Sequence, residues 1–384
     1  MSEKKHSVVS RLSLAALALP GLMHEAAAGR VDETYNADFQ YGHYSESGQR
    51  MDVDIFEGAV AVPIGKAMTA SLNLVRDTIS GASPRFNLKN SQGVRQVLSG
   101  ASIREQRDAI SSALTYYLDT AAISVGGGYS RENDYTSRYA NTNLSIDLNK
   151  KLTTLNFGAS VAFDEVEPTD YDYKKGKSSQ QYLLGVSQIL DKDSVLVSNM
   201  TFGYHQGFLS DPYKLVFFNG GGLLSDTRPS DKFQWSWLTQ YIRHFKDFNS
   251  AALHADYRFY TDDWGINAHT FEVSWHQPLV DEWQIIPRFR YYSQDRADFY
   301  QDYFENGDTT AFYSSDYRLA GFGTFSGGLK LSKEVKGLKV NQLKLQAGAE
   351  YYDHKSSYQL GGNGGGSFSD FSYYLLTASV NMKF

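Results

Sequence analysis

The sequence predicts an all-β fold, a transmembrane antiparallel up-and-down β-barrel of about 16 strands, and three observations support this prediction. The last eleven residues alternate between apolar and polar side chains, the connections between candidate strands alternate between short and long, and the first 28 residues have the form of an export signal. The mean hydropathy of −0.42 agrees with such a fold, because only every second residue of a barrel strand faces lipid.

The carboxy-terminal strand has the clearest pattern. Apolar side chains occupy every second position, at Tyr374, Leu376, Ala378, Val380, Met382 and Phe384. A period of two indicates a strand with one apolar face, and a tilted strand crosses the hydrocarbon of a bilayer with roughly 9 to 11 residues. We interpret this face as the signal that outer-membrane barrels present to the barrel assembly machinery, and the final strand of a soluble sandwich is the alternative. The residues assigned to the signal are Tyr374, Leu376, Val380, Met382 and Phe384.

The amino-terminus predicts export. A basic stretch ending at Arg11 precedes a short apolar core from Leu12 to Leu22, and Ala26 to Ala28 supply small residues before a cleavage site. This is the form of a secretory signal peptide, and it is too short to span a membrane. We predict a cleaved signal peptide over residues 1–28 and a single outer-membrane β-barrel domain over residues 29–384, located in the outer membrane of a Gram-negative cell.

Composition argues against several other classes of protein. Cysteine is absent, which excludes a disulfide scaffold and a thiolate metal site. The formal net charge of −6 argues against nucleic acid as a partner. The chain shows neither a linker nor a repeat of about 20–50 residues that would indicate a solenoid or a propeller.

Alternating segments predict sixteen strands. They are expected near residues 35–44, 50–63, 66–78, 104–118, 120–131, 138–148, 152–163, 180–190, 194–206, 232–244, 250–261, 266–277, 283–294, 316–331, 338–352 and 371–384. Short connections at 63–66, 118–120, 149–151, 191–193, 246–249, 277–282 and 332–337 contrast with long segments at 79–103, 164–179, 207–231, 295–315 and 353–370. Short periplasmic turns and long extracellular loops are typical of an outer-membrane barrel. The first three strands and the tenth are the least regular, so 12 or 14 strands are the alternatives.

The hairpin from Tyr139 to Phe163 shows which face of the wall is apolar. Leu144, Phe157 and their alternate neighbours are apolar, while small and polar residues lie between them. A polar interior and an apolar exterior are the reverse of a soluble barrel and indicate contact with lipid.

Four stretches of sequence resemble a known family. They are DTISGASP from Asp77, YSRENDY from Tyr129, YRFYTDDWGI from Tyr257 and RYYSQ from Arg290. They resemble a family of uncharacterised proteobacterial outer-membrane proteins whose shared domain has no assigned function. The resemblance implies an outer-membrane barrel, and it supplies no catalytic or binding residues. Some members of that family are encoded near enzymes that attach flavin to exported proteins, which implies a redox context.

The densest polar cluster lies on three successive predicted strands, in the phase that faces the interior. Its members are His254, Asp256, Arg258, Glu272, His276, Arg288, Arg290 and Tyr292. Opposite charges that face each other on adjacent strands stabilise a sheet by roughly 0.2–1 kcal/mol per pair. The cluster is therefore interpreted as a lumen-lining group, either a salt-bridge ladder in the wall or a charged constriction or docking surface, with catalysis as a third hypothesis.

Candidates for catalysis and metal binding are weak. His254 and Asp256 share a face and could act as base and orienting carboxylate, but Ser274 is within reach only if the strand register allows it, so no catalytic residue is predicted. No histidine spacing typical of a metal site occurs, and no metal or cofactor is predicted. Acidic residues of one predicted loop could bind a divalent cation or simply be solvated; they are Asp164, Glu165, Glu167, Asp170 and Asp172. The five tryptophans are expected in the interface girdle, at positions 235, 237, 264, 275 and 283.

Three functions remain as hypotheses. The first is a pore or conduit for small polar solutes, and the second is a barrel scaffold that holds a small periplasmic lipoprotein or a redox partner. The third is an outer-membrane hydrolase, although the chain is not predicted to be an enzyme. The expected surroundings are outer-membrane lipid and lipopolysaccharide.

Overall fold

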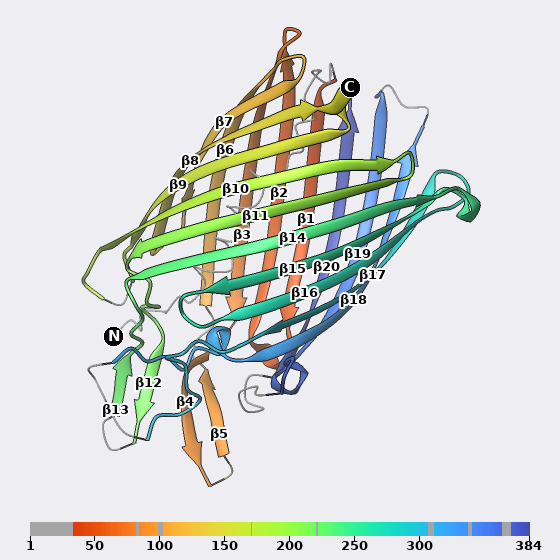
Figure 1. Ribbon diagram of the computed structural model, residues 1–384. Coiled ribbons are helices and arrows are strands. Elements are labelled where there is room, and N and C mark those ends of the chain that lie inside the picture. Colours follow the sequence, from red (N-terminus) through yellow and green to blue (C-terminus); the bar gives the residue numbers. More distant parts are fainter. Residues whose placement is uncertain are drawn as a thin grey trace.

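The computed structural model confirms the barrel and its sixteen strands (Figure 1). It describes residues 34–81, 84–91, 93–98, 103–169, 171–219, 222–305, 311–336, 340–362 and 370–384. The predicted signal peptide lies outside these residues and stays a prediction. The wall strands are β1 (Asn36–Glu46), β2 (Met51–Ile64), β3 (Met68–Gly81), β6 (Ile103–Tyr117), β7 (Ala121–Arg131), β8 (Tyr135–Leu148), β9 (Thr153–Val166), β10 (Lys175–Asp191), β11 (Ser194–Gly207), β14 (Asp231–Phe245), β15 (Ala251–Asp262), β16 (Asn267–Pro278), β17 (Trp283–Gln294), β18 (Phe322–Val335), β19 (Gln342–Lys355) and β20 (Phe371–Lys383).

Every wall strand pairs with its neighbours in chain order, and β1 pairs with β20 to close the sheet. All of these pairings are antiparallel, so the connections alternate between the two ends of the barrel. One end, here called the turn end, holds the short connections that follow even-numbered wall strands, together with the start of β1 and the end of β20. The other end, here called the loop end, holds the long connections and lies below the barrel in Figure 1.

The loop end holds three short connections, at 47–50, 132–134 and 263–266, where the predicted strand ranges also left only short gaps. It differs from the prediction in one respect. Two long loops contain hairpins of their own, which the sequence did not predict: β4 (Pro84–Asn90) with β5 (Gly93–Leu98), and β12 (Leu215–Phe218) with β13 (Gly222–Ser225). Both hairpins project beyond the wall (Figure 1).

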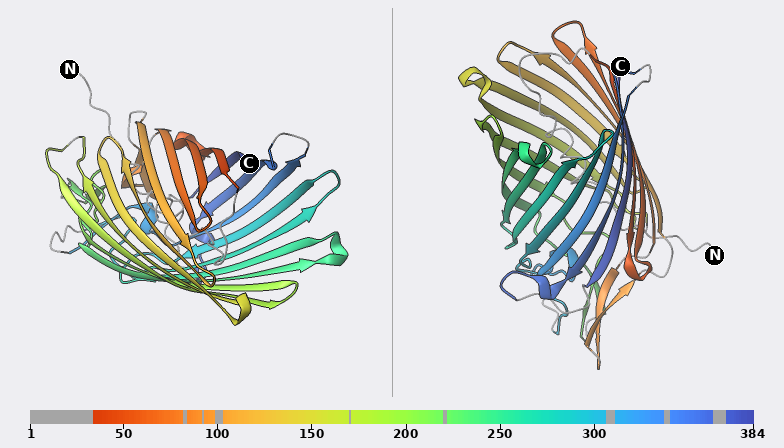
Figure 2. Two further views of the ribbon diagram at one scale, coloured as in Figure 1. Left: turned by 90° about the horizontal axis from the view of Figure 1, so that it is seen from above. Right: turned by 90° about the vertical axis from the view of Figure 1, so that its right-hand side faces the viewer.

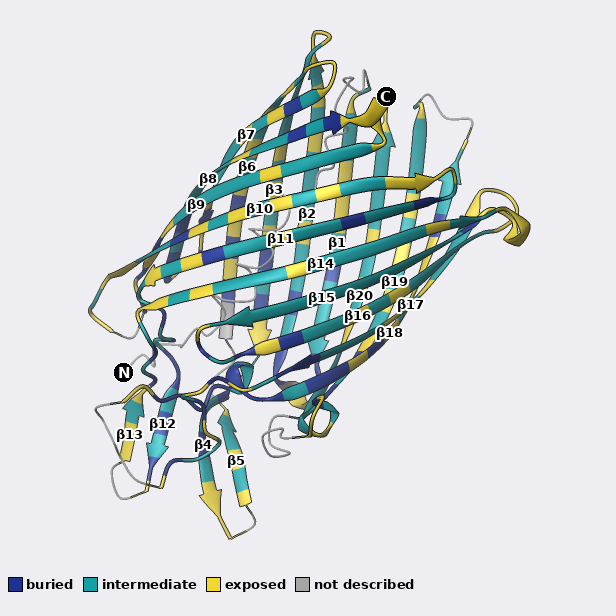
Figure 3. Ribbon diagram, in the orientation of Figure 1, coloured by how far each residue is buried: buried dark blue, intermediate teal, exposed yellow. Residues whose placement is uncertain are grey.

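The outer face of the wall is apolar, as the alternation predicted. Val125 and Phe163 expose 60% and 61% of their surface, and Phe157 and Leu184 are also exposed. Exposed and covered positions alternate along most wall strands (Figure 3). Large exposed apolar side chains at every second position match a wall that contacts lipid rather than water.

Tight turns at the turn end depend on left-handed backbone. Asn149, Lys150 and Lys151 have φ values of 50°, 57° and 70°, and they join β8 to β9 in the predicted place. Asn249 adopts the same region with a φ of 54° after β14. Asparagine tolerates this conformation better than most residues, which helps to fix the register of the strands on either side. Among the described residues, no helix is long and apolar enough to cross a membrane.

Candidate functional site

The predicted charged cluster lies on β15, β16 and β17, and strand register decides which members meet. Glu272 is opposite Asp256 on one side and opposite Arg290 on the other. Its contact, however, is diagonal: Arg288 Nε and Nη2 donate to the two carboxylate oxygens of Glu272 at 2.8 and 2.7 Å. The pair is bidentate, the geometry that gives an arginine–carboxylate contact both strength and direction.

Arg288 also reaches a carboxylate two strands away. Its Nη1 donates to Oε1 and Oε2 of Glu350 on β19 at 2.7 and 2.6 Å. The intervening residue on β18 is Gly328, which is opposite Arg288 and Glu350 in the two registers. A Cβ atom on Gly328 would lie 2.5 Å from Cγ of Glu350, so the missing side chain is what lets the triad form. Arg288, Glu272 and Glu350 therefore make a salt-bridge ladder across four strands.

Arg258 and Arg290 differ from Arg288 because neither has an ion-pair or hydrogen-bond partner within the part of the chain that the structure describes. Arg258 is opposite Thr270, and both arginines are half-buried. Asp256, the nearest predicted acid, accepts instead from Gln240 Nε2 at 3.1 Å. Two guanidinium groups on this wall are therefore left without a paired anion.

One stretch of the interior wall is neutral. Midway along β8, β9 and β11 the corresponding face carries Asn141, Asn143, Asn156 and Asn199, with glycine, serine and threonine between them. Asn156, for example, accepts from Ser145 Oγ at 2.8 Å. Only β14 separates β11 from β15 in the sheet, so this neutral polar stretch lies beside the charged strands, and together they give the interior a polar surface that water can fill.

The remaining cluster members test the catalytic hypothesis. Register places Ser274 opposite His254, and Ser274 Oγ lies 3.2 Å from His276 Nε2. The rings of His254 and His276 stack with centroids 4.2 Å apart. Among the described residues no carboxylate bonds to either imidazole, so the serine–histidine contact has no orienting acid of the kind that a triad requires. Tyr292 donates to Gln294 Oε1 at 2.7 Å.

Three long loops at the loop end pack together, and they are called the loop cap here: residues 84–98, 208–230 and 295–321, as far as these are described. The right-hand view of Figure 2 shows these loops beyond the rim of the wall. One apolar cluster of the cap combines residues from two loops and consists of Val216, Phe218, Phe304 and Tyr313. Asn87 Nδ2 donates to the Asp302 carbonyl at 3.0 Å and ties the third loop to them.

A buried network of ions holds the loop cap. Its members alternate in sign and are Asp211, Lys214, Asp226, Arg228, Asp316 and Arg318. Arg228 Nε donates to Asp226 at 2.7 Å, and Nη2 of the same residue donates to Asp316 at 2.8 Å. Arg318 joins Asp316 to Asp211, with Nη2 donating to Asp211 at 2.5 Å. The network links residues about 100 positions apart, so it fixes the relative position of two loops.

Burial and neighbouring charges together set the protonation of this network. It lowers the pKa of the Lys214 ammonium to about 8, because loss of hydration outweighs attraction to Asp316. Burial alone would raise the pKa of Asp316, but Arg318, Lys214 and Arg228 together hold it well below its usual value of 3.8. Asp316 therefore carries a negative charge at neutral pH even though its side chain is fully buried.

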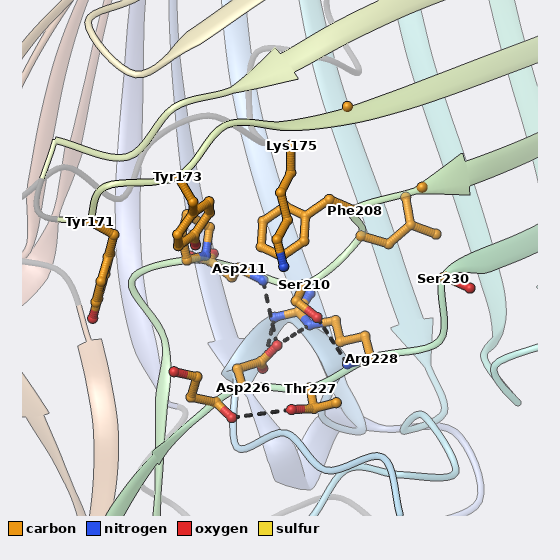
Figure 4. A pocket seen from close by; sticks show the side chains of 15 residues that line it. Tyr171, Tyr173, Lys175, Phe208, Ser210, Asp211, Asp226, Thr227, Arg228 and Ser230 are labelled. Atoms are coloured by element: carbon orange, nitrogen blue, oxygen red, sulfur yellow. Dashed lines mark hydrogen bonds and ion pairs between the residues drawn. The ribbon is translucent and has the colours of Figure 1, made fainter.

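A cavity of about 640 Å³ adjoins the loop cap next to the start of β10 (Figure 4). Lys175 Nζ lies 5.2 Å from the ring centroid of Tyr173 and 4.8 Å from that of Phe208. Asp211 and Arg228 of the ion network line the same space. One cation between two aromatic rings, beside a fixed charge network, gives the cavity a mixed apolar and polar lining.

Other predicted residues have varied environments. Tyr374, Leu376 and Phe384 of the assigned insertion signal are exposed on or just after β20, whereas Val380 and Met382 are half-buried. Trp264 is not in a girdle: only 6% of its surface is exposed, because it packs against Ala297 and Tyr300 at the base of the cap. Of the acidic residues in the predicted loop, Asp164 forms an ion pair with Lys177, and Glu165 forms one with Lys174. Asp170 lies outside the described residues.

Sequence reasoning missed the ion network and an acidic group formed by Glu105, Glu132 and Asp134. The only local signal for the network is the recurrence of acidic and basic residues one to three positions apart, as in Asp226 with Arg228 and Asp316 with Arg318. That signal is common in solvated loops, so it does not distinguish a buried network from an exposed one.

The fold and its apolar exterior define the protein as an outer-membrane β-barrel. The family model described as "Protein of unknown function (DUF3570)" matches residues 9–375, and the chain belongs to that family. The family resemblance inferred from the four stretches is thereby confirmed. No curated protein matches the sequence.

Solved structures resemble the chain in fold. CdiB from Acinetobacter baumannii is similar with a TM-score of 0.52 and 10% identity, covering 92% of this chain and 60% of that one. OccD3 (OpdP) from Pseudomonas aeruginosa matches with a TM-score of 0.45 and 11% identity over 93% of both chains. A BenF-like porin from Pseudomonas fluorescens Pf-5 matches with a TM-score of 0.45 and 11% identity over 92% of this chain and 99% of its own. At these identities the likeness concerns the fold alone.

Proposed function

We propose that the protein is an outer-membrane pore or conduit for small polar solutes and that it favours anions. The observation that carries the proposal is the pair of arginines, Arg258 and Arg290, which lie without an ion-pair partner among the described residues on the inner face of the wall. Charge between low-dielectric walls focuses the field and raises the local concentration of counter-ions. Glu272 and Glu350 offset this field only in part, since both are bonded to Arg288.

Ion preference tests the proposal. In planar bilayers with a salt gradient, the wild-type barrel is expected to prefer anions, and the preference should weaken near 0.15 M salt, where the Debye length is about 8 Å. Replacing Arg258 and Arg290 with glutamine should reduce or reverse the preference, because glutamine keeps length and polarity and loses charge. Arg243→Gln is the matched control, since Arg243 is exposed on the lipid-facing phase of β14. Equal anion preference in the double variant and the wild type would contradict the proposal.

The orientation of the barrel is part of the proposal, with the loop end outside the cell and the turn end in the periplasm. Epitope tags inserted in 167–174 and in 208–230 are therefore expected to label on intact cells. A tag in the turn at Asn149–Lys151 should label only after the outer membrane is permeabilised. Labelling of that turn on intact cells, or of neither loop, would reverse the assignment.

The loop cap favours a second candidate, a barrel that holds a periplasmic lipoprotein or redox partner without steady conductance. A buried ion network fixes the loops at this end of the barrel, and the candidate requires that these loops block passage. The bilayer recordings separate the two candidates, because a steady conductance supports the pore and its absence in inserted protein supports the scaffold. The hydrolase hypothesis has the least support, given the isolated Ser274–His276 contact.

A further inference from the structure

Three carboxylates that the pore does not use converge at the loop end. Glu105 is near the start of β6, and Glu132 and Asp134 belong to the three-residue loop between β7 and β8. One oxygen from each lies within 4.8 Å of the others, and all three residues are buried. The short loop fixes two of the acids, because Glu132 N donates to the Tyr135 carbonyl at 2.7 Å and Glu167 N donates to the Asp134 carbonyl at 2.8 Å.

The environment of Glu105 is a second, independent observation. It is 97% buried, with 3% of its surface exposed, and among the described residues neither carboxylate oxygen accepts a hydrogen bond of standard geometry, although the Asp134 carboxylate and the Asn133 backbone lie nearby. Asp134, also 3% exposed, uses one oxygen to accept from the Tyr213 hydroxyl at 2.5 Å, and its other oxygen has no partner in the same part of the chain. No basic side chain forms an ion pair with Glu105 or Asp134 within the described residues. A buried carboxylate without a partner is strongly unfavourable, and several of them together repel one another.

We propose that Glu105, Glu132 and Asp134 bind a divalent cation of the Ca²⁺ class. Hard cations take carboxylate and carbonyl oxygens, and Ca²⁺ accepts six to eight of them at about 2.3–2.6 Å in flexible geometry. Oxygens on opposite sides of such an ion are about 5 Å apart, so the observed spacing suits it. The cation supplies the missing partner for Glu105 and neutralises the repulsion among the three acids.

The position of the site gives the cation a structural consequence. Tyr213 bonds to Asp134 and is followed directly by Lys214 of the ion network. The hydroxyl of Tyr213 also accepts from Thr169 N at 3.3 Å, which adds the β9–β10 loop. Cation binding therefore ties β6 and two neighbouring loops to residues 208–230 and strengthens the loop cap on the wall. This inference does not depend on whether the barrel conducts.

Calcium titration of the full-length barrel, refolded in detergent and stripped with EDTA, tests the site. Calorimetry with CaCl₂ is expected to show one site in the wild type. Glu105→Gln should bind on the order of tenfold or more weakly, because ligand charge sets affinity. Glu165→Gln is the control, since Glu165 is an exposed loop-end carboxylate paired with Lys174, and it should bind like the wild type.

Thermal unfolding with and without calcium distinguishes a cation ligand from a residue that only supports the fold. In EDTA, Glu105→Gln should melt at or above the wild-type temperature, because it removes an unpartnered buried charge. In saturating CaCl₂ the order should reverse, since only the wild type gains the bound ion. If Glu105→Gln fails to fold, Asp134→Asn takes its place in both experiments. Asparagine keeps an oxygen that accepts from Tyr213 and loses the charge that would bind the cation. Absence of calcium binding in the wild type, or wild-type affinity in the folded variant, would overturn the proposal.

Discussion

Asp316→Ala is expected to open the loop cap and leave the barrel wall intact. The side chain of Asp316 is fully buried and bonds to Arg228 and Arg318. Its removal leaves the buried cations of the network with two carboxylates instead of three. Breaking a buried ion pair by removing one partner costs about 3–5 kcal/mol, which is enough to unfold a cap held by loops. The wall keeps its continuous backbone pairing, since Asp316 lies outside every wall strand.

Limited trypsin digestion measures this effect, because Lys214, Arg228 and Arg318 are themselves cleavage sites. They are shielded in the wild type, where Lys214 and Arg228 are buried, and we expect rapid cleavage there only in the variant. A heat-modifiable shift on a gel should show that the barrel is still folded. Asp172→Ala, at an exposed loop position, should digest like the wild type. Wild-type resistance in Asp316→Ala would mean that the network does not hold the cap.

The wall was predictable because lipid contact imposes a period of two on the sequence. Phe157 and Phe163 are exposed, as the alternation required, and the sixteen predicted segments correspond to the sixteen wall strands. Outside the hydrocarbon this constraint ends, and the predicted ends of several strands were wrong there. The tenth wall strand, β14, forms although its sequence pattern is irregular. Its neighbours β11 and β15 both pair with it along most of its length.

The loop end could not be predicted because its contacts are long-range. A strand was expected from residue 316, but Asp316 caps a short helical turn at Tyr317–Leu319, and β18 begins only at Phe322. The side chain of Asp316 accepts from the backbone of Arg318 nearby, and it also accepts from Arg228, 88 positions earlier. Neither periodicity nor composition contains that second contact. The same holds for the acidic group, in which Glu105 meets Glu132 and Asp134 through strand pairing.

The sequence predicted which residues of β15, β16 and β17 form the charged cluster, but it did not predict which of them form ion pairs. Alternation placed Asp256, Glu272 and Arg288 on one face, and antiparallel order placed them on adjacent strands. The partner of Arg288 on β19 depends on the register of β18 and on the glycine there, so Glu350 was absent from the predicted cluster. The salt-bridge ladder is formed by Arg288, whereas the charged constriction stays a hypothesis that concerns Arg258 and Arg290.

Arg288→Gln is expected to destabilise the barrel, whereas Arg290→Gln is not. Arg288 is the only described cation bonded to Glu272 and Glu350, and glutamine cannot neutralise either acid. The side chains of the triad remain 20–27% exposed, so water recovers part of the loss. We therefore expect about 2 kcal/mol of destabilisation, below the range for a fully buried pair. Arg290 has no bonded acid among the described residues, so its replacement leaves no new unpaired charge.

Unfolding of the detergent-solubilised barrel, followed by heat or denaturant, distinguishes the two variants. The triad adds a second test, because its members are coupled. Glu350→Gln in the Arg288→Gln background should restore part of the lost stability by removing one of the two orphaned carboxylates, and the double-mutant cycle should show a coupling energy of about 0.5–3 kcal/mol. If Arg288→Gln is as stable as the wild type, the ladder contributes nothing to stability. If the effects of the two substitutions are strictly additive, Arg288 and Glu350 act independently.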